Sequence, residues 1–293
     1  MQVRIIGGLG NQLFTYFAGV LYSEIHGKKL VVDLGQLEMI GTSHGASIAG
    51  FKLPHEVSYI KAGKYLEFWK RLRSVILRKR IISGKNFAKL SGFYASNEIG
   101  FDSEFCVLFN LSKVEGYFQT YRYFDALQDE KFKKLELPNP SAWFLENSQL
   151  LDSESYIVLH VRRGDFRKYK ESVGLLSSSY YLRAVKEIDK LRSDNLPIWV
   201  FSDEIELAKG LLEGVSDRIV KFVDQPIESS ANESLLLMSR AAAIVIANST
   251  FSWWAATLGS KKIVIAPREW FKGAKNPTDL YPPNWHQIQS TWE

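Results

Sequence analysis

The chain has 293 residues, of which 37 are basic, 32 are acidic and 46% are hydrophobic. This composition is typical of globular proteins and excludes a disordered chain, and the length suffices for one large domain or two of about 150 residues each. Cys106 is the single cysteine, which excludes an intrachain disulfide and a cysteine-rich zinc module.

The first residues, MQVRIIGGLGNQLF, lack the basic-then-apolar pattern of a secretory signal, so we expect a cytoplasmic protein. A run of 20 uncharged residues between Arg240 and Lys261 has the length of a membrane span. Its centre carries Asn248 and Ser249, which a bilayer interior disfavours. We therefore predict a buried strand, a polar loop and a buried helix in this run.

The N-terminal half begins with a β-loop-α-β unit of Rossmann type. Residues 40–110 give no clear assignment, and the acidic, proline-containing stretch 136–141 is a candidate linker. The predicted elements are strands at Val3–Ile6, Lys29–Asp33 and Lys113–Tyr117, a glycine loop at Gly7–Gly10, and a helix at Asn11–Ile25.

A strongly basic segment runs from Lys61 to Lys89, with ten basic residues and one acidic residue, Glu67. Its apolar residues recur at steps of four, three and four, which is the spacing of one helix face: Tyr65, Trp69, Leu72 and Ile76. A basic amphipathic helix suits an anionic membrane surface. The alternatives are a helix that packs on its own domain, with basic side chains reaching water, and a nucleic-acid contact, which we do not expect.

The second half alternates between apolar, β-branched strands and helices, which indicates a parallel sheet covered on both faces. The predicted strands are Tyr156–His160, Ile198–Phe201, Arg218–Val223, Ala243–Ile246 and Lys262–Ala266, and the helices are Ser179–Lys190, Glu204–Leu212, Asn232–Arg240 and Phe251–Leu258. We predict an α/β protein with two Rossmann-like domains, 1–140 and 141–293, and a cleft between them. Ligands of such sheets bind at the carboxyl ends of the strands.

Four motifs follow predicted strands. The glycine loop lets a ligand approach the backbone at a helix N-terminus, but it is neither a P-loop nor a dinucleotide fingerprint, because Leu13 stands where a third glycine is needed. A tight turn is the alternative. In HVRRGD, the forks of Arg162 and Arg163 suit phosphate oxygens. A structural ion pair with Asp165 and a core role for His160 are the alternatives.

The third motif, FSDE, follows the next strand. The Asp203 carboxylate would accept two N–H bonds from a purine such as guanine, with help from Ser202. The alternative is that the carboxylate caps the following helix. The fourth, NSTFSWW at 248–254, offers small polar side chains and backbone N–H groups that form a phosphate or ribose cradle. We also expect Ser249 or Thr250 to cap the helix and the tryptophans to pack in the core behind it. No D-x-D triplet occurs and the five histidines are scattered, so we expect no metal site and no cofactor.

These motifs, GGLGNQLF at 7–14, HVRRGDF at 160–166, FSDE at 201–204 and NSTFSWWAA at 248–256, together resemble the bacterial α-1,2-fucosyltransferases of glycosyltransferase family 11. The segment EGYFQTYRYF at 115–124 is also similar to that family. HxRRxD alone is shared with α-1,6- and protein O-fucosyltransferases. This sequence departs from the family pattern at Glu204, Thr15 and Phe17. Thr15 follows the glycine loop, so we expect these departures to affect the choice of acceptor.

The resemblance implies a GT-B fold and a GDP-β-L-fucose donor. It also implies metal-independent, inverting transfer, commonly to the 2-OH of a galactoside. Arg162 would hold the pyrophosphate and Asp203 the guanine. The glycine loop would face the reaction centre. The implied donor residues are Gly8, Gly10, Asn11, Arg162, Arg163, Ser202, Asp203, Asn248, Ser249, Thr250, Phe251 and Ser252, and the acceptor residues are Gln12, Thr15 and Gln119.

The acceptor hydroxyl must lose a proton, and Asp165 is the first candidate for the base, followed by His160 and Glu115. We expect a galactose-terminated glycan as acceptor. A lipid-linked form of it at the inner membrane face, where surface glycans are built, would suit the basic segment, which would hold the enzyme there. The alternatives are a glycosyltransferase with another nucleotide sugar, such as GDP-mannose, and a non-catalytic nucleotide-binding protein of the membrane surface.

Overall fold

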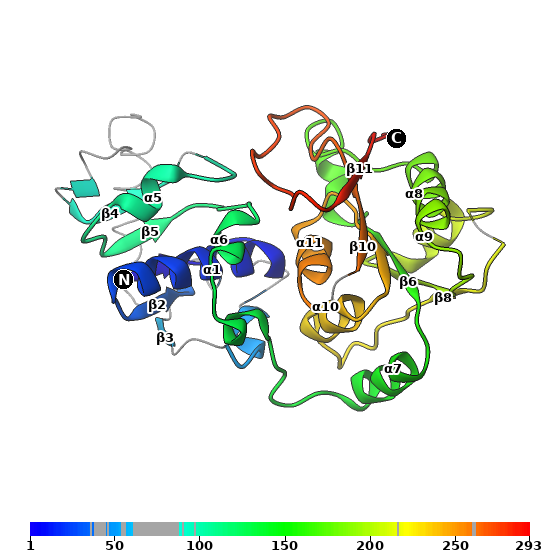
Figure 1. Ribbon diagram of the computed structural model, residues 1–293, viewed down its shortest axis with the longest axis horizontal. Helices are drawn as coiled ribbons and strands as arrows, with labels where there is room; N and C mark the ends of the chain where they lie inside the picture. Colours follow the sequence, from blue (N-terminus) through cyan, green and yellow to red (C-terminus); the bar gives the residue numbers. More distant parts are fainter. Residues whose placement is uncertain are drawn as a thin grey trace. The chain divides into compact units, whose positions relative to one another are not determined.

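The computed structural model describes residues 1–35, 37, 45, 47–53, 57–60, 88–89, 91–96, 98–215, 217–259 and 262–293 (Figure 1). The chain divides into two compact units. Unit 1 comprises Met1–Glu136 with Pro277–Pro282, and unit 2 comprises Leu137–Asn276 with Pro283–Glu293. Each unit has its own parallel sheet. Both therefore have the α/β architecture that the sequence predicts.

The sequence-based boundary at residue 140 lies close to this division, but it leaves 277–282 in the second domain. In the structure this segment belongs to unit 1. The Thr120 hydroxyl donates to the Asp279 carbonyl at 2.6 Å, and Arg122 pairs with the Asp279 carboxylate at 3.0 Å. The segment is short and forms a turn at Thr278 and Asp279, so its sequence has no periodic pattern that would show which core it packs on.

Unit 1 is built on a five-stranded sheet of order β3-β2-β1-β5-β4. Helix α1 (Leu9–His26) follows β1 and ends at Gly27, whose φ of 61° is a left-handed conformation that glycine adopts without strain. The strands are β1 Gln2–Arg4, β2 Leu30–Asp33, β3 Val57–Ile60, β4 Phe93–Ala95 and β5 Lys113–Glu115, and the short helices are η1 Ser47–Gly50, α5 Ser103–Val107, α6 Arg122–Asp125 and η2 Glu130–Lys133.

Unit 2 is built on a six-stranded parallel sheet of order β11-β10-β9-β6-β7-β8, in which β6 is buried at all five positions. The strands are β6 Ile157–Val161, β7 Ile198–Ser202, β8 Val220–Phe222, β9 Ala243–Val245, β10 Ile263–Pro267 and β11 His286–Ile288. The helices are α7 Ala142–Ser153, η3 Asp165–Tyr169, α8 Ser178–Leu191, α9 Ile205–Leu211, α10 Ala231–Ser239 and α11 Thr250–Thr257.

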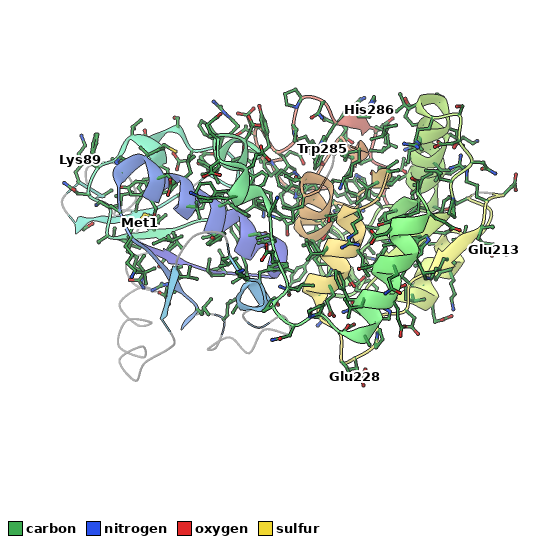
Figure 2. The ribbon with its side chains drawn as sticks, turned by 60° about the horizontal axis from the view of Figure 1, so that its bottom comes forward. Met1, Lys89, Glu213, Glu228, Trp285 and His286 are labelled. Carbon is green, nitrogen blue, oxygen red and sulfur yellow. The ribbon has the colours of Figure 1, made fainter. Side chains whose placement is uncertain are left out.

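The alternation predicted for this half is confirmed to within a few residues, whereas α7, η3 and β11 were not predicted. Strand β11 is at the edge of the sheet; Trp285 precedes it and His286 is its first residue (Figure 2). Trp285 is buried, with its ring 5.6 Å from that of Trp253, whereas His286 is exposed. This edge strand is short and polar, so its sequence does not show the apolar run on which the other predictions depended.

The long uncharged run is a strand, a loop and a helix, as predicted. It contains β9 and α11, and both Trp253 and Trp254 are fully buried. Across the part of the chain that the structure describes, no helix is long and apolar enough to cross a membrane. The predicted basic amphipathic helix lies outside the described residues, apart from Ala88 and Lys89, so it stays a prediction.

Candidate active site

The centre of the candidate site is Arg162, which follows β6 at the carboxyl edge of the unit 2 sheet. Its Nη2 lies 2.6 Å from Asp165 Oδ1, and its Nη1 lies 3.1 Å from Asp203 Oδ2. The arginine side chain is 18% exposed and that of Asp165 is 49% exposed. Two carboxylates therefore hold the guanidinium in one orientation, and one of them is open to solvent.

Asp203 also shapes the backbone beside this arginine. The Arg163 backbone N–H donates to Asp203 Oδ1 at 2.9 Å. A Cβ atom on Gly164 would lie 2.3 Å from Asp203 Oδ2, so a side chain at this position forces the carboxylate away. Because Asp203 follows β7, this contact joins the ends of two neighbouring strands. The steric need for Gly164 was not predicted, although a glycine between two charged motif residues is a usable signal.

The second arginine of the motif has a different environment. Arg163 is 3% exposed, and its Nη2 donates to the Leu176 carbonyl at 2.7 Å and pairs with Glu293 Oε1 at 3.1 Å. Its Nη1 is buried without a hydrogen-bond partner among the described residues. This geometry favours a positioning role, in which Arg163 holds the segment around Leu176. The predicted direct contact with a donor stays a prediction.

Ser202 and Glu204 flank Asp203 and complete the turn after β7. The Ser202 hydroxyl accepts the Glu204 backbone N–H at 3.1 Å, and the Glu204 carboxylate pairs with Arg167 at 2.6 Å. These contacts brace the turn, and the Asp203 carboxylate is already used by Arg162 and the Arg163 N–H. The predicted roles of Ser202 and Asp203 toward a purine stay predictions.

The Asn248–Ser252 segment joins β9 to α11, and β9 is the other neighbour of β6 in the sheet. The Asn248 amide donates to three backbone carbonyls, those of Val173, Gly174 and Trp270, at 3.0–3.3 Å. Ser252 is fully buried and its hydroxyl donates to the Ser249 carbonyl at 3.2 Å. Both side chains therefore fix the loop rather than face outward.

The start of α11 is the part of this segment that suits an anion. Ser249 precedes the helix, and its side chain makes no capping hydrogen bond. The backbone N–H groups of the first helical turn, which includes Thr250 and Phe251, have no acceptor within a helix, and they form its positive end. Since β6 and β9 are adjacent and parallel, this helix start and Arg162 lie at the same sheet edge. A guanidinium and a helix N-terminus together form a site for phosphate.

His160 lies in β6 beneath this edge. It is 4% exposed, its ring centroid lies 5.6 Å from that of Phe251, and its Nδ1 has no hydrogen-bond partner among the described residues. Burial lowers the pKa of His160 to about 3, and the nearby charge of Arg162 adds to this effect. The imidazole is therefore neutral at pH 7, and its burial weakens the case for His160 as the catalytic base.

The glycine loop of unit 1 is braced by a side chain that was predicted to bind an acceptor. Gln12 is fully buried, and its Nε2 donates to the carbonyls of Gly7 and Gly45, both at 2.9 Å. Its Oε1 accepts the Ile48 N–H at 2.9 Å. Gly7 has a φ of 70°, which suits glycine, and Gly8 precedes α1 while Gly10 lies in its first turn. Gln12 thus fixes the loop conformation.

Two further predicted residues connect the loop to the segment after β5. Gln119 Nε2 donates to Asn11 Oδ1 at 2.9 Å, and Gln119 Oε1 is buried without a partner among the described residues. The Thr15 hydroxyl, fully buried, donates to the carbonyls of Asn11 and Gly116. Two of the predicted motifs, GGLGNQLF and EGYFQTYRYF, therefore meet inside unit 1. Glu115, the third candidate base, is paired with Arg4.

No set of three histidine, cysteine or acidic side chains that could hold a metal ion occurs among the residues that the structure describes. The predictions that the site needs no metal and no cofactor are not tested by this observation. What the geometry does provide is fixed positive charge, on Arg162 and at the start of α11.

A family model described as glycosyl transferase family 11 matches residues 112–289, which include β6, the Arg162 turn and α11. The chain belongs to glycosyltransferase family 11. An α-1,2-colitosyltransferase of Escherichia coli is 30% identical, with 98% of each chain covered. The O-antigen biosynthesis glycosyltransferase WbnK of the same species is 25% identical, with 97% of this chain and 99% of that chain covered. The predicted family is confirmed.

Solved structures share the fold. A crystal structure of the α-1,6-fucosyltransferase NodZ soaked with GDP-fucose has a TM-score of 0.51 and 16% identity, and it covers 88% of this chain and 92% of that chain. NodZ from Bradyrhizobium gives the same score and identity, covering 87% and 91%. At this identity the likeness shows the fold alone, which is that of the GT-B glycosyltransferases. The predicted α/β fold class of GT-B type is confirmed, and the cleft between the two domains stays a prediction.

The buried His160 makes a prediction for stability in acid. Its pKa is below the ordinary 6.5 in the folded protein, so between pH 6.5 and about 3 the unfolded chain binds a proton that the folded protein does not. Folding stability is therefore lost as the pH falls through this window, by at most about 1.4 kcal/mol per pH unit for this group.

We expect His160→Gln to reduce the slope of unfolding free energy against pH below 6.5, as measured by urea unfolding at a series of pH values. The control is His286→Gln, which replaces an exposed histidine of the same unit and should leave the slope unchanged. Equal slopes for wild type and His160→Gln would contradict the burial argument.

Proposed function

We propose that this chain is an inverting α-1,2-fucosyltransferase that moves L-fucose from GDP-β-L-fucose to the 2-OH of a galactoside in surface glycan synthesis. The observation that carries the proposal is Arg162, preset between Asp165 and Asp203 at the sheet edge where α11 begins. Membership of glycosyltransferase family 11 supports sugar transfer. The solved relative soaked with GDP-fucose has the same fold, which is compatible with this donor.

The chemistry explains why these residues suit the reaction. As the bond between the fucose anomeric carbon and the phosphate oxygen breaks, GDP leaves with that electron pair, and negative charge grows on its pyrophosphate. The Arg162 guanidinium and the N–H groups at the start of α11 are already oriented, so they stabilise this charge without reorganisation. We infer that they take the role that a divalent cation has in other enzymes, and that no metal is needed.

The acceptor 2-OH attacks the anomeric carbon from the opposite face, which inverts the configuration, and its proton passes to a base. Asp165 suits this role best among the three candidates, because it is half exposed and borders Arg162, whereas His160 is buried and Glu115 is paired with Arg4. Among the predicted acceptor residues, Gln119 has an amide oxygen without a partner among the described residues, whereas Gln12 and Thr15 bond backbone groups.

One specific alternative to fucose as the transferred sugar is colitose. The 30% identical relative is named for the transfer of colitose, a sugar that differs from fucose by the lack of the 3-hydroxyl. A site that hydrogen-bonds this hydroxyl rejects the deoxy sugar strongly, by up to about 10⁴-fold. Comparison of GDP-fucose with GDP-colitose therefore distinguishes the two donors, and GDP-mannose tests the wider alternative.

The test is incubation of the protein with each nucleotide sugar and a panel of galactosides, with measurement of GDP release and linkage analysis of the product. We expect an α-1,2-linked fucosyl galactoside and a rate unchanged by EDTA. Calorimetry should give binding of GDP and none of UDP. Binding of GDP without transfer to any acceptor would favour the non-catalytic alternative, and activity lost with EDTA and restored by manganese would contradict the metal-free proposal.

Replacement of Arg162 tests its role in charge stabilisation. Arg162→Ala should remain folded and lose about 10²-fold or more in rate, because a preset positive group at the leaving pyrophosphate is removed. Arg162→Lys should recover only part of this loss, since lysine lacks the planar fork. Arg192→Ala is the control, because Arg192 pairs with Asp194 away from this sheet edge. Near-normal activity in Arg162→Ala would contradict the assignment.

Replacement of Asp165 separates its two possible roles. As a base, Asp165→Asn should lower kcat by about 10²-fold or more and remove the acidic limb of the pH–rate profile. As a partner of Arg162 only, the substitution should leave the profile unchanged and alter the KM for the donor instead. A profile identical to that of the wild type would exclude Asp165 as the base.

A further inference from the structure

Unit 1 exposes three large apolar side chains near the end of α1. The side chains of Ile25, Val107 and Phe109 are 53%, 64% and 73% exposed. Ile25 lies in the last turn of α1, Val107 is the last residue of α5, and Phe109 lies in the segment between α5 and β5. We name these three residues the apolar tip. Exposed large apolar residues that gather in one place mark interaction surfaces.

The two segments of the apolar tip are held together by specific bonds. The Tyr22 hydroxyl donates to the Leu108 carbonyl at 2.8 Å and accepts the Leu111 N–H at 3.0 Å. His26 Nε2 lies 3.0 Å from the Cys106 carbonyl, and the His26 ring centroid lies 5.1 Å from that of Phe109. The apolar residues are therefore presented by a fixed scaffold that continues into the core of unit 1.

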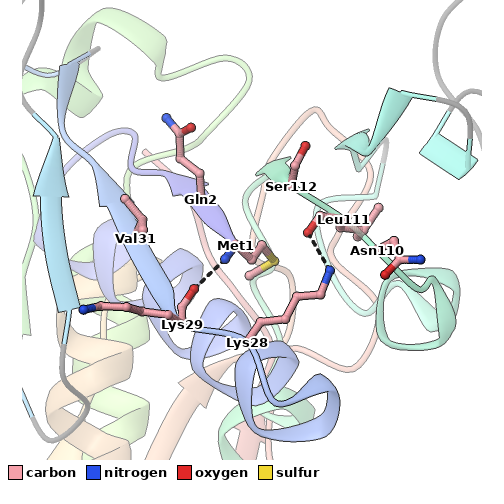
Figure 3. Close-up of a pocket in the computed structure, with 8 residues that line it drawn as sticks. All are labelled: Met1, Gln2, Lys28, Lys29, Val31, Asn110, Leu111 and Ser112. Atoms are coloured by element: carbon pink, nitrogen blue, oxygen red, sulfur yellow. Dashed lines mark hydrogen bonds between the residues drawn. The ribbon is translucent and has the colours of Figure 1, made fainter.

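A basic pocket of about 500 Å³ adjoins the apolar tip, at the amino ends of β1, β2 and β5 (Figure 3). Lys28 and Lys29 line it, and no acidic side chain does; its other wall is formed by Asn110, Leu111 and Ser112. Lys28 Nζ donates to the Leu111 carbonyl at 3.4 Å, a long bond that leaves donors available. In Figure 3 the two lysine ammonium groups point to opposite sides of the pocket.

This pocket is distinct from the site proposed for fucosyl transfer. It lies at the amino ends of the unit 1 strands, whereas the glycine loop follows the carboxyl end of β1. Glu24, the acidic residue beside Ile25, lies within electrostatic range of Lys131. Two cationic groups flank the pocket, next to exposed aliphatic and aromatic side chains. This combination matches a phospholipid surface, in which the phosphate groups lie outermost and the hydrocarbon lies below them.

We propose that the apolar tip and the basic pocket dock this chain on an anionic phospholipid membrane. Phe109, Val107 and Ile25 enter the headgroup layer, and Lys28 and Lys29 pair with lipid phosphates. The orientation is set by described residues of unit 1 alone, so the docking does not depend on the basic segment 61–89, and it stands whether or not the transfer reaction is as proposed. Charge complementarity favours a lipid surface over an apolar protein partner.

The experiment is cosedimentation of the full chain with vesicles of phosphatidylcholine alone and with phosphatidylglycerol added. The wild type should bind the anionic vesicles, and added salt should weaken this binding. Phe109→Asp and Val107→Asp should each lower the bound fraction about fivefold or more at equal lipid concentration. The matched control is Ile227→Asp, which changes a 94% exposed apolar residue of unit 2 and should bind as the wild type does.

The basic pocket is tested in the same assay with Lys28→Gln/Lys29→Gln, whose binding to anionic vesicles should fall about tenfold. Lys186→Gln/Lys275→Gln, a pair of exposed lysines in unit 2, is the control and should retain binding. Thermal unfolding of each variant should match that of the wild type. Absence of wild-type binding, or full binding by the Phe109, Val107 and double-lysine variants, would overturn the proposal.

Discussion

The carboxylate of Asp203 is the contact on which the geometry of the candidate site depends. It accepts the Arg163 backbone N–H, pairs with the Arg162 guanidinium and leaves no room for a side chain at Gly164. The Asp203 carboxylate, which follows β7, therefore fixes the turn after β6 and orients the Arg162 guanidinium. The turn follows β6 directly, and β6 is rigid because all five of its residues are buried.

The same contact explains how a strong positive charge is tolerated without a ligand. Arg162 has two carboxylate partners, and the more exposed of them, Asp165, is the one that an incoming phosphate is best able to replace. In the proposed reaction the donor phosphate takes the place of Asp165 on Arg162, while Asp203 maintains the orientation of the guanidinium. Such preorganisation favours charge that develops as the leaving group departs. In unit 1, Gln12 has an equivalent role toward the glycine loop, which it holds through three backbone groups.

The sequence predicts those parts of the site that depend on neighbouring residues in the chain. Arg162 follows a run of apolar, β-branched residues, and such a run in a parallel sheet has a carboxyl end where ligands bind. The neighbouring Arg163 has the same chemistry in sequence, and only the fold shows that its guanidinium faces Leu176 and Glu293. For the same reason the place of 277–282 in unit 1 was not predicted, since it depends on contacts with Thr120 and Arg122 that are distant in sequence. Strand β11 was not predicted because it is short and polar. The bracing role of Gln12 likewise depends on a long-range bond to Gly45.

The central claim is that Arg162 and the start of α11 receive the donor pyrophosphate. A crystal structure of the protein with GDP tests it most directly. The account predicts that the Arg162 guanidinium leaves Asp165 for a phosphate oxygen and keeps its contact with Asp203, while N–H groups at the start of α11 bond to the same pyrophosphate. Pyrophosphate bound elsewhere in unit 2, with Arg162 still paired to both carboxylates, would contradict it.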